Sequence, residues 1–145
     1  MLKAIYTIGL LFLVSTVFAQ SGDEIWKTLA TVEINTKMDE NLGFEIEFPT
    51  FSEEIKKLDG KEVTVAGYMM PLPELQGENY FVLSLLPFNN CFFCGGAGPE
   101  TVMEVFSKKQ IDFTEKKVKV KGKLTINPDD PMRLMYILKE AVLVK

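Results

Sequence analysis

The sequence predicts a mainly β protein, a small barrel with short helices. Apolar and polar residues alternate along several short runs, which is typical of strands that bury one face. Clusters of Gly, Pro, Asn and Asp separate these runs and indicate turns. Hydrophobic residues make up 47% of the 145 residues, and the sequence has no internal repeat. We therefore expect one domain with a single core.

The first residues have the pattern of a cleaved signal peptide. Lys3 supplies a positive start, residues 4–18 form an apolar run, and Val17 and Ala19 are the small residues of a cleavage site. The run is shorter than the ~20 residues that a spanning helix needs. We expect residues 1–19 to be removed by a cut after Ala19, with no stable membrane insertion afterwards. The mature protein would be soluble and periplasmic or secreted.

Residues 20–60 predict an N-terminal extension of short elements that packs on a barrel formed by residues 61–145. Thr50 and Glu53 fit a capping box at the start of a helix. The elements expected in the extension are a helix within residues 22–30, strands at residues 32–34 and 44–48 that could form a hairpin, and a helix from the capping box to Leu58.

The barrel region has the element order of an OB fold, with strands, then one helix, then two strands. The helix is expected to begin at Pro99, because proline suits a first helical turn and apolar residues up to Phe106 recur along one side. Gly67 and Gly122 interrupt strand patterns, as at bends or bulges. Strands are expected at residues 61–72, 80–86, 118–126 and 134–144. We predict an OB-like five-stranded Greek-key barrel with a helix between strands 3 and 4; a mixed α+β sheet is the alternative.

Composition argues against several functions. Histidine is absent, which removes the commonest general base and the usual imidazole ligand. The formal net charge is −4, and loss of Lys3 makes it more negative, so we expect no nucleic-acid partner. A basic stripe on one predicted strand, which could suit an oligonucleotide, is better explained as a solvated face that deters aggregation. The stripe consists of Lys117, Lys119, Lys121 and Lys123.

Cys91 and Cys94 are the only cysteines and form a Cys-x-x-Cys motif. Two thiolates at this spacing could hold zinc or cuprous copper. The same pair could cycle between thiol and disulfide, although in the familiar redox arrangement the cysteines lie at the helix start itself. A structural disulfide that staples the loop is the third reading, and it suits an oxidising compartment.

Two cysteines are too few for a tight zinc site, so further ligands are needed. Met70, Met103 and Glu100 are the candidates that complete the predicted metal site within this chain. A glycine-rich turn follows the cysteines, and as an anion-binding nest it is a weak signal. Its residues Gly95, Gly96, Gly98 and Pro99 are expected to shape the cysteine loop.

The sequence also resembles a family of small exported bacterial proteins classed as a domain of unknown function, some encoded near metal-uptake transporters. The shared residues cover most of the mature chain. They are Trp26 and Leu29; Phe48-Pro49 and Phe51; Leu58-Asp59-Gly60-Lys61-Glu62-Val63; Gly67-Tyr68-Met69-Met70-Pro71-Leu72; Phe81-Val82-Leu83; Leu86-Pro87-Phe88; and Cys91.

The departures from that family fall on the site. Many relatives have a histidine two residues after the cysteine, then a proline run ending in Asn-Gln. Here Cys94 stands near the histidine position, residues 95–98 replace most of the prolines, Pro99 matches the last, and Glu100-Thr101 replace Asn-Gln. The resemblance implies an exported OB-like domain with a candidate site at Cys91 and Cys94.

We therefore predict an exported binding protein that holds a thiophilic metal ion, zinc or cuprous copper, at Cys91 and Cys94. Its partner would be an unidentified protein, with a metal-transport component as the candidate. The alternatives are a thiol-disulfide redox protein and an interaction domain with a structural disulfide. No catalytic residues are predicted, so an enzyme is not indicated.

Overall fold

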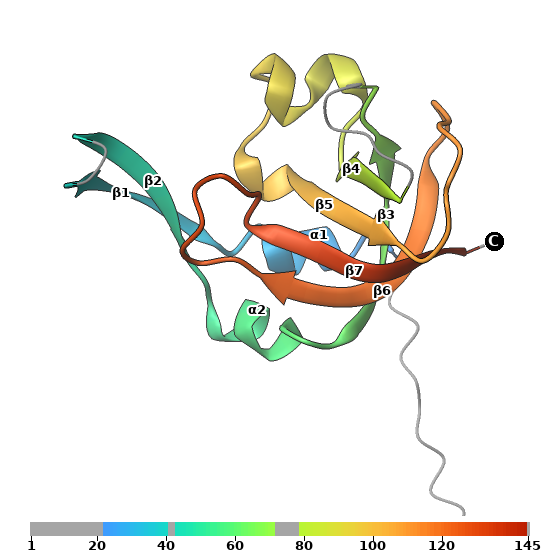
Figure 1. The fold of residues 1–145 in the computed structure, drawn as a ribbon, viewed down its shortest axis with the longest axis horizontal. Coiled ribbons are helices and arrows are strands. Elements are labelled where there is room, and N and C mark those ends of the chain that lie inside the picture. The colour runs from blue at the N-terminus through green and yellow to red at the C-terminus, as the bar shows by residue number, and fades with distance from the viewer. Residues whose placement is uncertain (1–21, 41–42, 72–78, 145) are drawn as a thin grey trace, which may run out of the picture.

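The computed structural model describes residues 22–40, 43–71 and 79–144, and the predicted signal peptide lies outside them. Among the described residues, no helix is long and apolar enough to cross a membrane. The elements are, in order, α1 (Ile25–Leu29), β1 (Glu33–Asp39), β2 (Phe44–Thr50), α2 (Glu53–Leu58), β3 (Glu62–Met69), β4 (Tyr80–Ser84), the short 3-10 helices η2 (Phe88–Asn90), η3 (Phe92–Cys94) and η4 (Pro99–Thr101), β5 (Val102–Ser107), β6 (Val118–Ile126) and β7 (Tyr136–Val144) (Figure 1).

Five strands close into a barrel in the order β3-β4-β5-β7-β6, with β6 pairing back to β3. Only the β5–β7 pair is parallel, and the other four pairs are antiparallel. Neighbouring strands in the barrel are thus not all neighbours in sequence, as in a Greek key. The predicted fold class, a mainly β protein with an OB-like five-stranded barrel, is confirmed.

The helix predicted from Pro99 to Phe106 is wrong. Pro99 opens a 3-10 turn of three residues, and Val102–Ser107 is strand β5. A short apolar run buried on both faces cannot be assigned to helix or strand by periodicity, and the β-branched Val102 and Val105 favour the strand. Residues 108–117, between β5 and β6, contain no helix. The helices that cover the barrel core are α1 and α2 instead.

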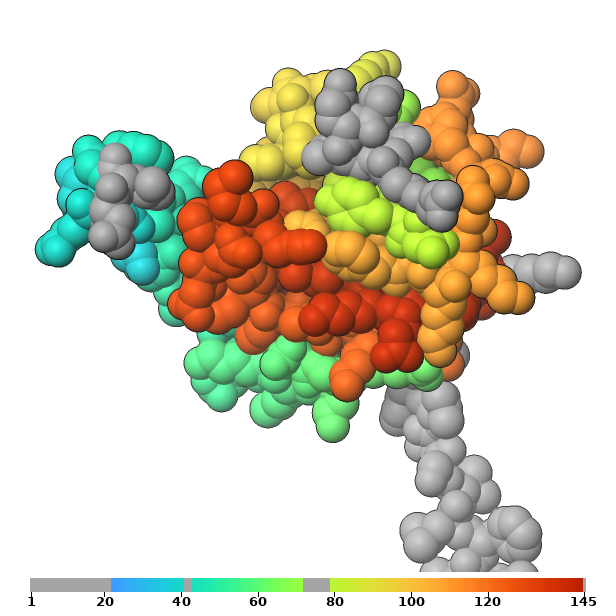
Figure 2. Space-filling view, in the orientation of Figure 1, coloured from blue at the N-terminus to red at the C-terminus, as the bar shows by residue number. Residues whose placement is uncertain are grey.

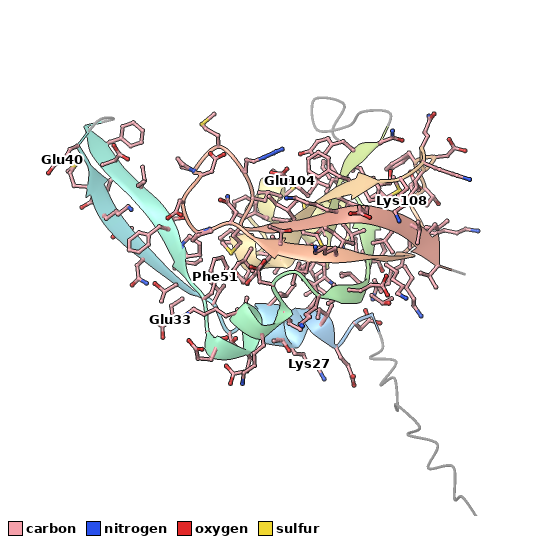
Figure 3. All side chains as sticks on the ribbon, turned by 60° about the horizontal axis from the view of Figure 1, so that its bottom comes forward. Lys27, Glu33, Glu40, Phe51, Glu104 and Lys108 are labelled. Carbon is pink, nitrogen blue, oxygen red and sulfur yellow. The ribbon has the colours of Figure 1, made fainter. Side chains whose placement is uncertain are left out.

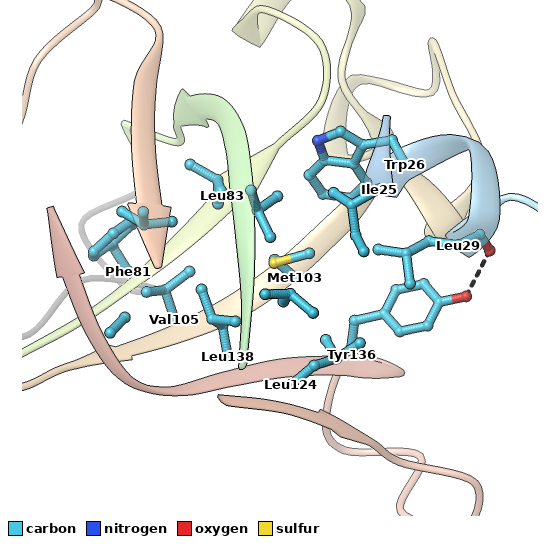
Figure 4. Packing of buried hydrophobic residues seen from close by; sticks show 14 of the residues in the cluster. Ile25, Trp26, Leu29, Phe81, Leu83, Met103, Val105, Leu124, Tyr136 and Leu138 are labelled. Atoms are coloured by element: carbon cyan, nitrogen blue, oxygen red, sulfur yellow. Dashed lines mark hydrogen bonds between the residues drawn. The ribbon is translucent and has the colours of Figure 1, made fainter. Parts of the chain in front are cut away.

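The N-terminal elements share the barrel's core. Trp26 of α1 is buried, and its indole N–H donates to the Ala66 carbonyl of β3 at 2.8 Å. Phe51 lies between β2 and α2 (Figure 3). The centroid of its ring is 5.9 Å from that of Tyr136 in β7. The Tyr136 hydroxyl donates to the Leu29 carbonyl at 2.6 Å (Figure 4). Helix α1 is therefore tied to both β3 and β7.

The expected hairpin and second helix are both present, but the helix cap differs from the prediction. β1 and β2 pair antiparallel along their whole length. Thr50 is the last residue of β2, and Ser52 caps α2 by accepting a hydrogen bond from the Ile55 N–H at 3.3 Å. The cap moves to Ser52 because pairing with β1 keeps Thr50 extended.

The barrel strands bury side chains on both faces, and this creates two clusters. The inner core fills the barrel with residues such as Leu83, Met103, Val105, Leu124 and Leu138 (Figure 4). The outer cluster lies on the other face of β3, β4 and β5. Its buried members are Met70, Val82, Cys91 and Val102. The outer cluster positions the candidate site.

Candidate functional site

The connection from β4 to β5, residues 85–101, carries both cysteines and folds against the outer face of these two strands. Cys91 is fully buried in the outer cluster, where it packs with Met70, Val82 and Val102. Phe92 is half-buried and packs against the same cluster. A loop that connects two strands therefore delivers a sulfur atom onto the face outside the barrel.

Cys91 and Cys94 bracket a single 3-10 turn, η3. The Cys91 carbonyl accepts hydrogen bonds from the N–H groups of Cys94 and Gly96, each at 3.1 Å. This turn brings the two sulfurs to 4.0 Å, with Cys91 buried and Cys94 exposed. A disulfide requires about 2.05 Å, so the pair is a dithiol in this structure.

The glycines after Cys94 allow this turn to form. Gly95 has φ 75°, a left-handed conformation that L side chains rarely adopt. Gly96 passes so close to Asn90 that a Cβ atom would lie 2.7 Å from the Asn90 carbonyl oxygen. The Glu100 carboxylate folds over Gly98. Small residues in this segment thus let the chain reverse tightly around the cysteines.

The three further predicted ligands lie in different places. Met70 belongs to the outer cluster with Cys91, and both are fully buried. Met103 lies in the inner core, because it follows Val102 in β5 and successive strand residues face opposite sides. Glu100 is half-buried, and after burial of the ring its charge is the second cause of the raised pKa of Tyr136. The structure therefore brings Met70, and not Met103, to the cysteine loop.

The electrostatics around Cys94 favour the protonated thiol. Desolvation, the hydrogen bond with Cys91 and the charge of Cys91 all raise the pKa of the Cys94 thiol above its ordinary value of 9.0. A raised pKa on one thiol of an interacting pair does not identify which thiol reacts, because the two protons belong to the pair. Metal binding could still displace the proton, because it stabilises the deprotonated sulfur.

In the part of the chain that the structure describes, no three His, Cys, Asp or Glu side chains gather where they could hold a metal ion. Of the lysine stripe, Lys119, Lys121 and Lys123 are exposed in β6, and Lys117 is exposed just before it. Lys117 pairs with Asp23, and Lys121 pairs with Glu62 at 2.6 Å.

A groove of ≈ 580 Å³ lies beside the outer cluster, and sequence reasoning did not predict it. It runs between the β1–β2 hairpin and the loop of residues 127–135, and Phe92 and Phe93 border it. Figure 2 shows the hairpin, in cyan, projecting beside this loop, in orange-red. Three segments that are distant in sequence form this groove, so no local pattern could show it.

Glu104 at the base of this groove was also missed. Its side chain is buried, accepts a hydrogen bond from the Leu134 N–H at 2.9 Å, and lies 3.5 Å from the Arg133 guanidinium. Arg133 also stacks over the Phe106 ring at 5.3 Å. The sequence does contain a pattern that could have indicated a buried charge here, because Glu104 is the only charged residue within an otherwise apolar run.

No protein-family model matches this chain, and no curated protein matches it. Among solved structures, the chain is similar to a DUF3299 family protein from Pseudomonas aeruginosa PAO1, whose crystal structure was determined at 2.45 Å resolution. The two share 18% sequence identity and superpose with a TM-score of 0.46, over 67% of this chain and 68% of that one.

Proposed function

We propose that this chain is a metal-binding protein that holds one cuprous ion through Cys91, Cys94 and Met70. The observation that carries the proposal is the convergence of these residues on one face of the barrel. The two sulfurs lie 4.0 Å apart, and Met70 packs in the same small cluster as Cys91.

The sulfur separation allows both thiolates to bind one ion. Two sulfurs 4.0 Å apart can each lie about 2.3 Å from a metal ion placed between them. The thioether of Met70 is the proposed third ligand. Thiolate and thioether ligands select Cu(I), whereas structural zinc sites are almost always tetrahedral with four ligands.

Burial of Cys91 and exposure of Cys94 suit a carrier. One sulfur is fixed inside the outer cluster, and the other faces the surface, where a partner's sulfur could replace it. The proposal includes export to an oxidising compartment and exchange of the ion with a metal-transport component. A thiol-disulfide role for the same pair is the alternative, and both roles use the two sulfurs that lie 4.0 Å apart.

The test is anaerobic titration of the reduced protein with Cu(I) in competition with a chromophoric chelator. We expect one ion per chain, and affinity that falls as the pH is lowered because protons compete for the two thiols. Cys91→Ser and Cys94→Ser should each abolish this binding. Met70→Leu should weaken it by at least tenfold, equal to about 1.4 kcal/mol.

Met103→Leu is the matched control, because Met103 is as fully buried as Met70 but lies in the inner core. It should leave the affinity unchanged. Equal losses in the two methionine variants would remove Met70 from the site. Copper binding that survives Cys94→Ser would contradict the proposed site as a whole, and tighter binding of zinc would contradict the choice of metal.

A further inference from the structure

We infer that the free edge of β2 is a docking site for an extended segment of a partner protein in which basic and apolar side chains alternate. This inference concerns the groove beside the hairpin and does not depend on copper. Six consecutive residues of β2, Phe44 to Pro49, line the groove. Consecutive residues alternate between the two faces of a strand, so the groove reaches the edge of β2 between those faces, and Ile34 and Lys37 of β1 also line it.

The backbone of β2 presents hydrogen-bonding groups along this edge. Among the described residues, β2 pairs only with β1. Pro49 lies opposite Ile34 and has no N–H to donate, as expected for a pair without mutual hydrogen bonds. At the other end of the hairpin, the Asp39 carbonyl accepts a hydrogen bond from the Gly43 N–H at 2.8 Å. The backbone N–H and C=O of Asp39 therefore point toward β2, and the pair of Asp39 with Phe44 is the hydrogen-bonded kind.

Both observations give the same alternation along the strand. The pairs formed by Phe44, Ile46 and Phe48 face β1, so the N–H and C=O groups of Glu45 and Glu47 point away from it. Glu45 and Glu47 therefore offer two donors and two acceptors along this edge, at the spacing that an added strand requires. Addition of a peptide strand to such an edge is a known mode of recognition.

The side chains of β2 determine which strand fits. Glu45 and Glu47 are exposed on one face, and Phe44, Ile46 and Phe48 lie on the other. Cross-strand neighbours of opposite charge stabilise a sheet, and neighbours of like charge destabilise it. A partner with Lys or Arg facing the glutamates and apolar residues on the other face is complementary to both faces.

The surroundings carry both charges. Asp129 and Asp130 line the groove from the opposite loop, and Arg133 is paired with Glu104. Lys37 of β1 also lines the groove, but it lies 4.9 Å over the Phe48 ring and therefore not on the face of Glu45 and Glu47. A second copy of this chain fits badly, because antiparallel pairing of two β2 edges about Ile46 would place Glu45 opposite Glu47. Charge of one sign on an edge strand is also a device against self-association.

The probes are labelled eight-residue peptides with blocked ends, one alternating Lys and Val and one alternating Glu and Val. Fluorescence anisotropy with the whole protein, without metal, should show at least tenfold tighter binding of the Lys–Val peptide. Methylating the backbone nitrogens along one edge of this peptide should weaken binding by at least tenfold, because strand pairing needs those donors.

The Glu45→Lys, Glu47→Lys double variant should reverse the preference toward the Glu–Val peptide. Glu53→Lys, Glu54→Lys is the matched control, since it makes the same charge change on exposed residues of α2. The inference is overturned by equal binding of both peptides, by no binding of the Lys–Val peptide at millimolar concentration, or by insensitivity to backbone methylation. A dimer in sedimentation that the β2 double variant dissolves would also overturn it.

Discussion

The two sides of strands β3, β4 and β5 bury similar side chains but do so for different reasons. The inner core is enclosed by five paired strands with α1 and α2 against it. The outer cluster is covered by the cysteine loop and by the residues before β7. Met69 and Met70 are adjacent in sequence yet belong to different clusters, as do Val102 and Met103. The inner side accounts for stability, and the outer side holds the candidate site.

The largest effect that tests this comparison is truncation of the two fully buried methionines. Met103→Ala should lower the free energy of unfolding by about 4 kcal/mol and Met70→Ala by about 2 kcal/mol, within the range measured for buried methionine truncations. The reason is that a closed barrel cannot collapse around a cavity, whereas a loop can. Urea unfolding of the reduced, metal-free proteins gives both values, and a larger loss for Met70→Ala would reverse the ranking.

A glycine from each region gives the next contrast. In Gly67→Ala the new Cβ would lie 2.5 Å from the Ser84 carbonyl oxygen of the paired strand, so we expect a loss of about 3 kcal/mol. In Gly95→Ala, in the cysteine loop, the new Cβ would have no atom within 4 Å, and the cost comes from the left-handed φ of 75°. We expect this variant to lose about 1 kcal/mol of unfolding free energy. Thermal unfolding of the two glycine variants gives the comparison. Equal shifts in Tm would mean that the barrel accommodates an added Cβ atom as readily as the loop does.

The smallest effect concerns Tyr136 and its counterpart on the outer face, Tyr80. Tyr136→Phe should cost about 1 kcal/mol at neutral pH, because the Leu29 carbonyl loses its donor. Burial first, then the charge of Glu100, raises the pKa of Tyr136 above 10.0. Above pH 10 the unfolded chain therefore loses this proton before the folded protein does, and stability falls as the pH rises.

Tyr136→Phe removes that alkaline loss, so the difference in stability between the variant and the unmodified protein should shrink above pH 10. Burial also raises the pKa of Tyr80, but Tyr80 is only half-buried, so Tyr80→Phe should change the alkaline slope less. Unfolding free energies at pH 7 and at pH 10.5 provide the check. An unchanged alkaline slope for Tyr136→Phe would show that another group controls it.

Much of this fold could be predicted because local chemistry is repeated along the chain. Alternation of side chains located β3, β6 and β7, and turn residues located their ends. β5 was mistaken for a helix because both of its faces are buried, so its run has no polar side to reveal a period of two. Thr50 was mistaken for a helix cap because strand pairing with β1 is not visible in its neighbours.

The candidate site was predicted only in part, for a related reason. Cys91 and Cys94 are close in sequence, and a single turn suffices to bring their sulfurs together. Met70 and Met103 could not be ranked as candidate ligands from the sequence. Each follows or precedes a run of apolar residues, and no local pattern shows which face of the strand either side chain occupies. The groove and the buried Glu104 depend on three separate segments meeting.

Side-chain periodicity and the spacing of near neighbours were enough to predict a small barrel with both cysteines in one short loop. The tertiary structure was needed to establish that this loop covers the outer face, that Met70 joins it and Met103 does not, and that the edge of β2 borders a groove. Those outcomes require barrel closure, which pairs residues far apart in the chain and assigns each side of a strand to one environment.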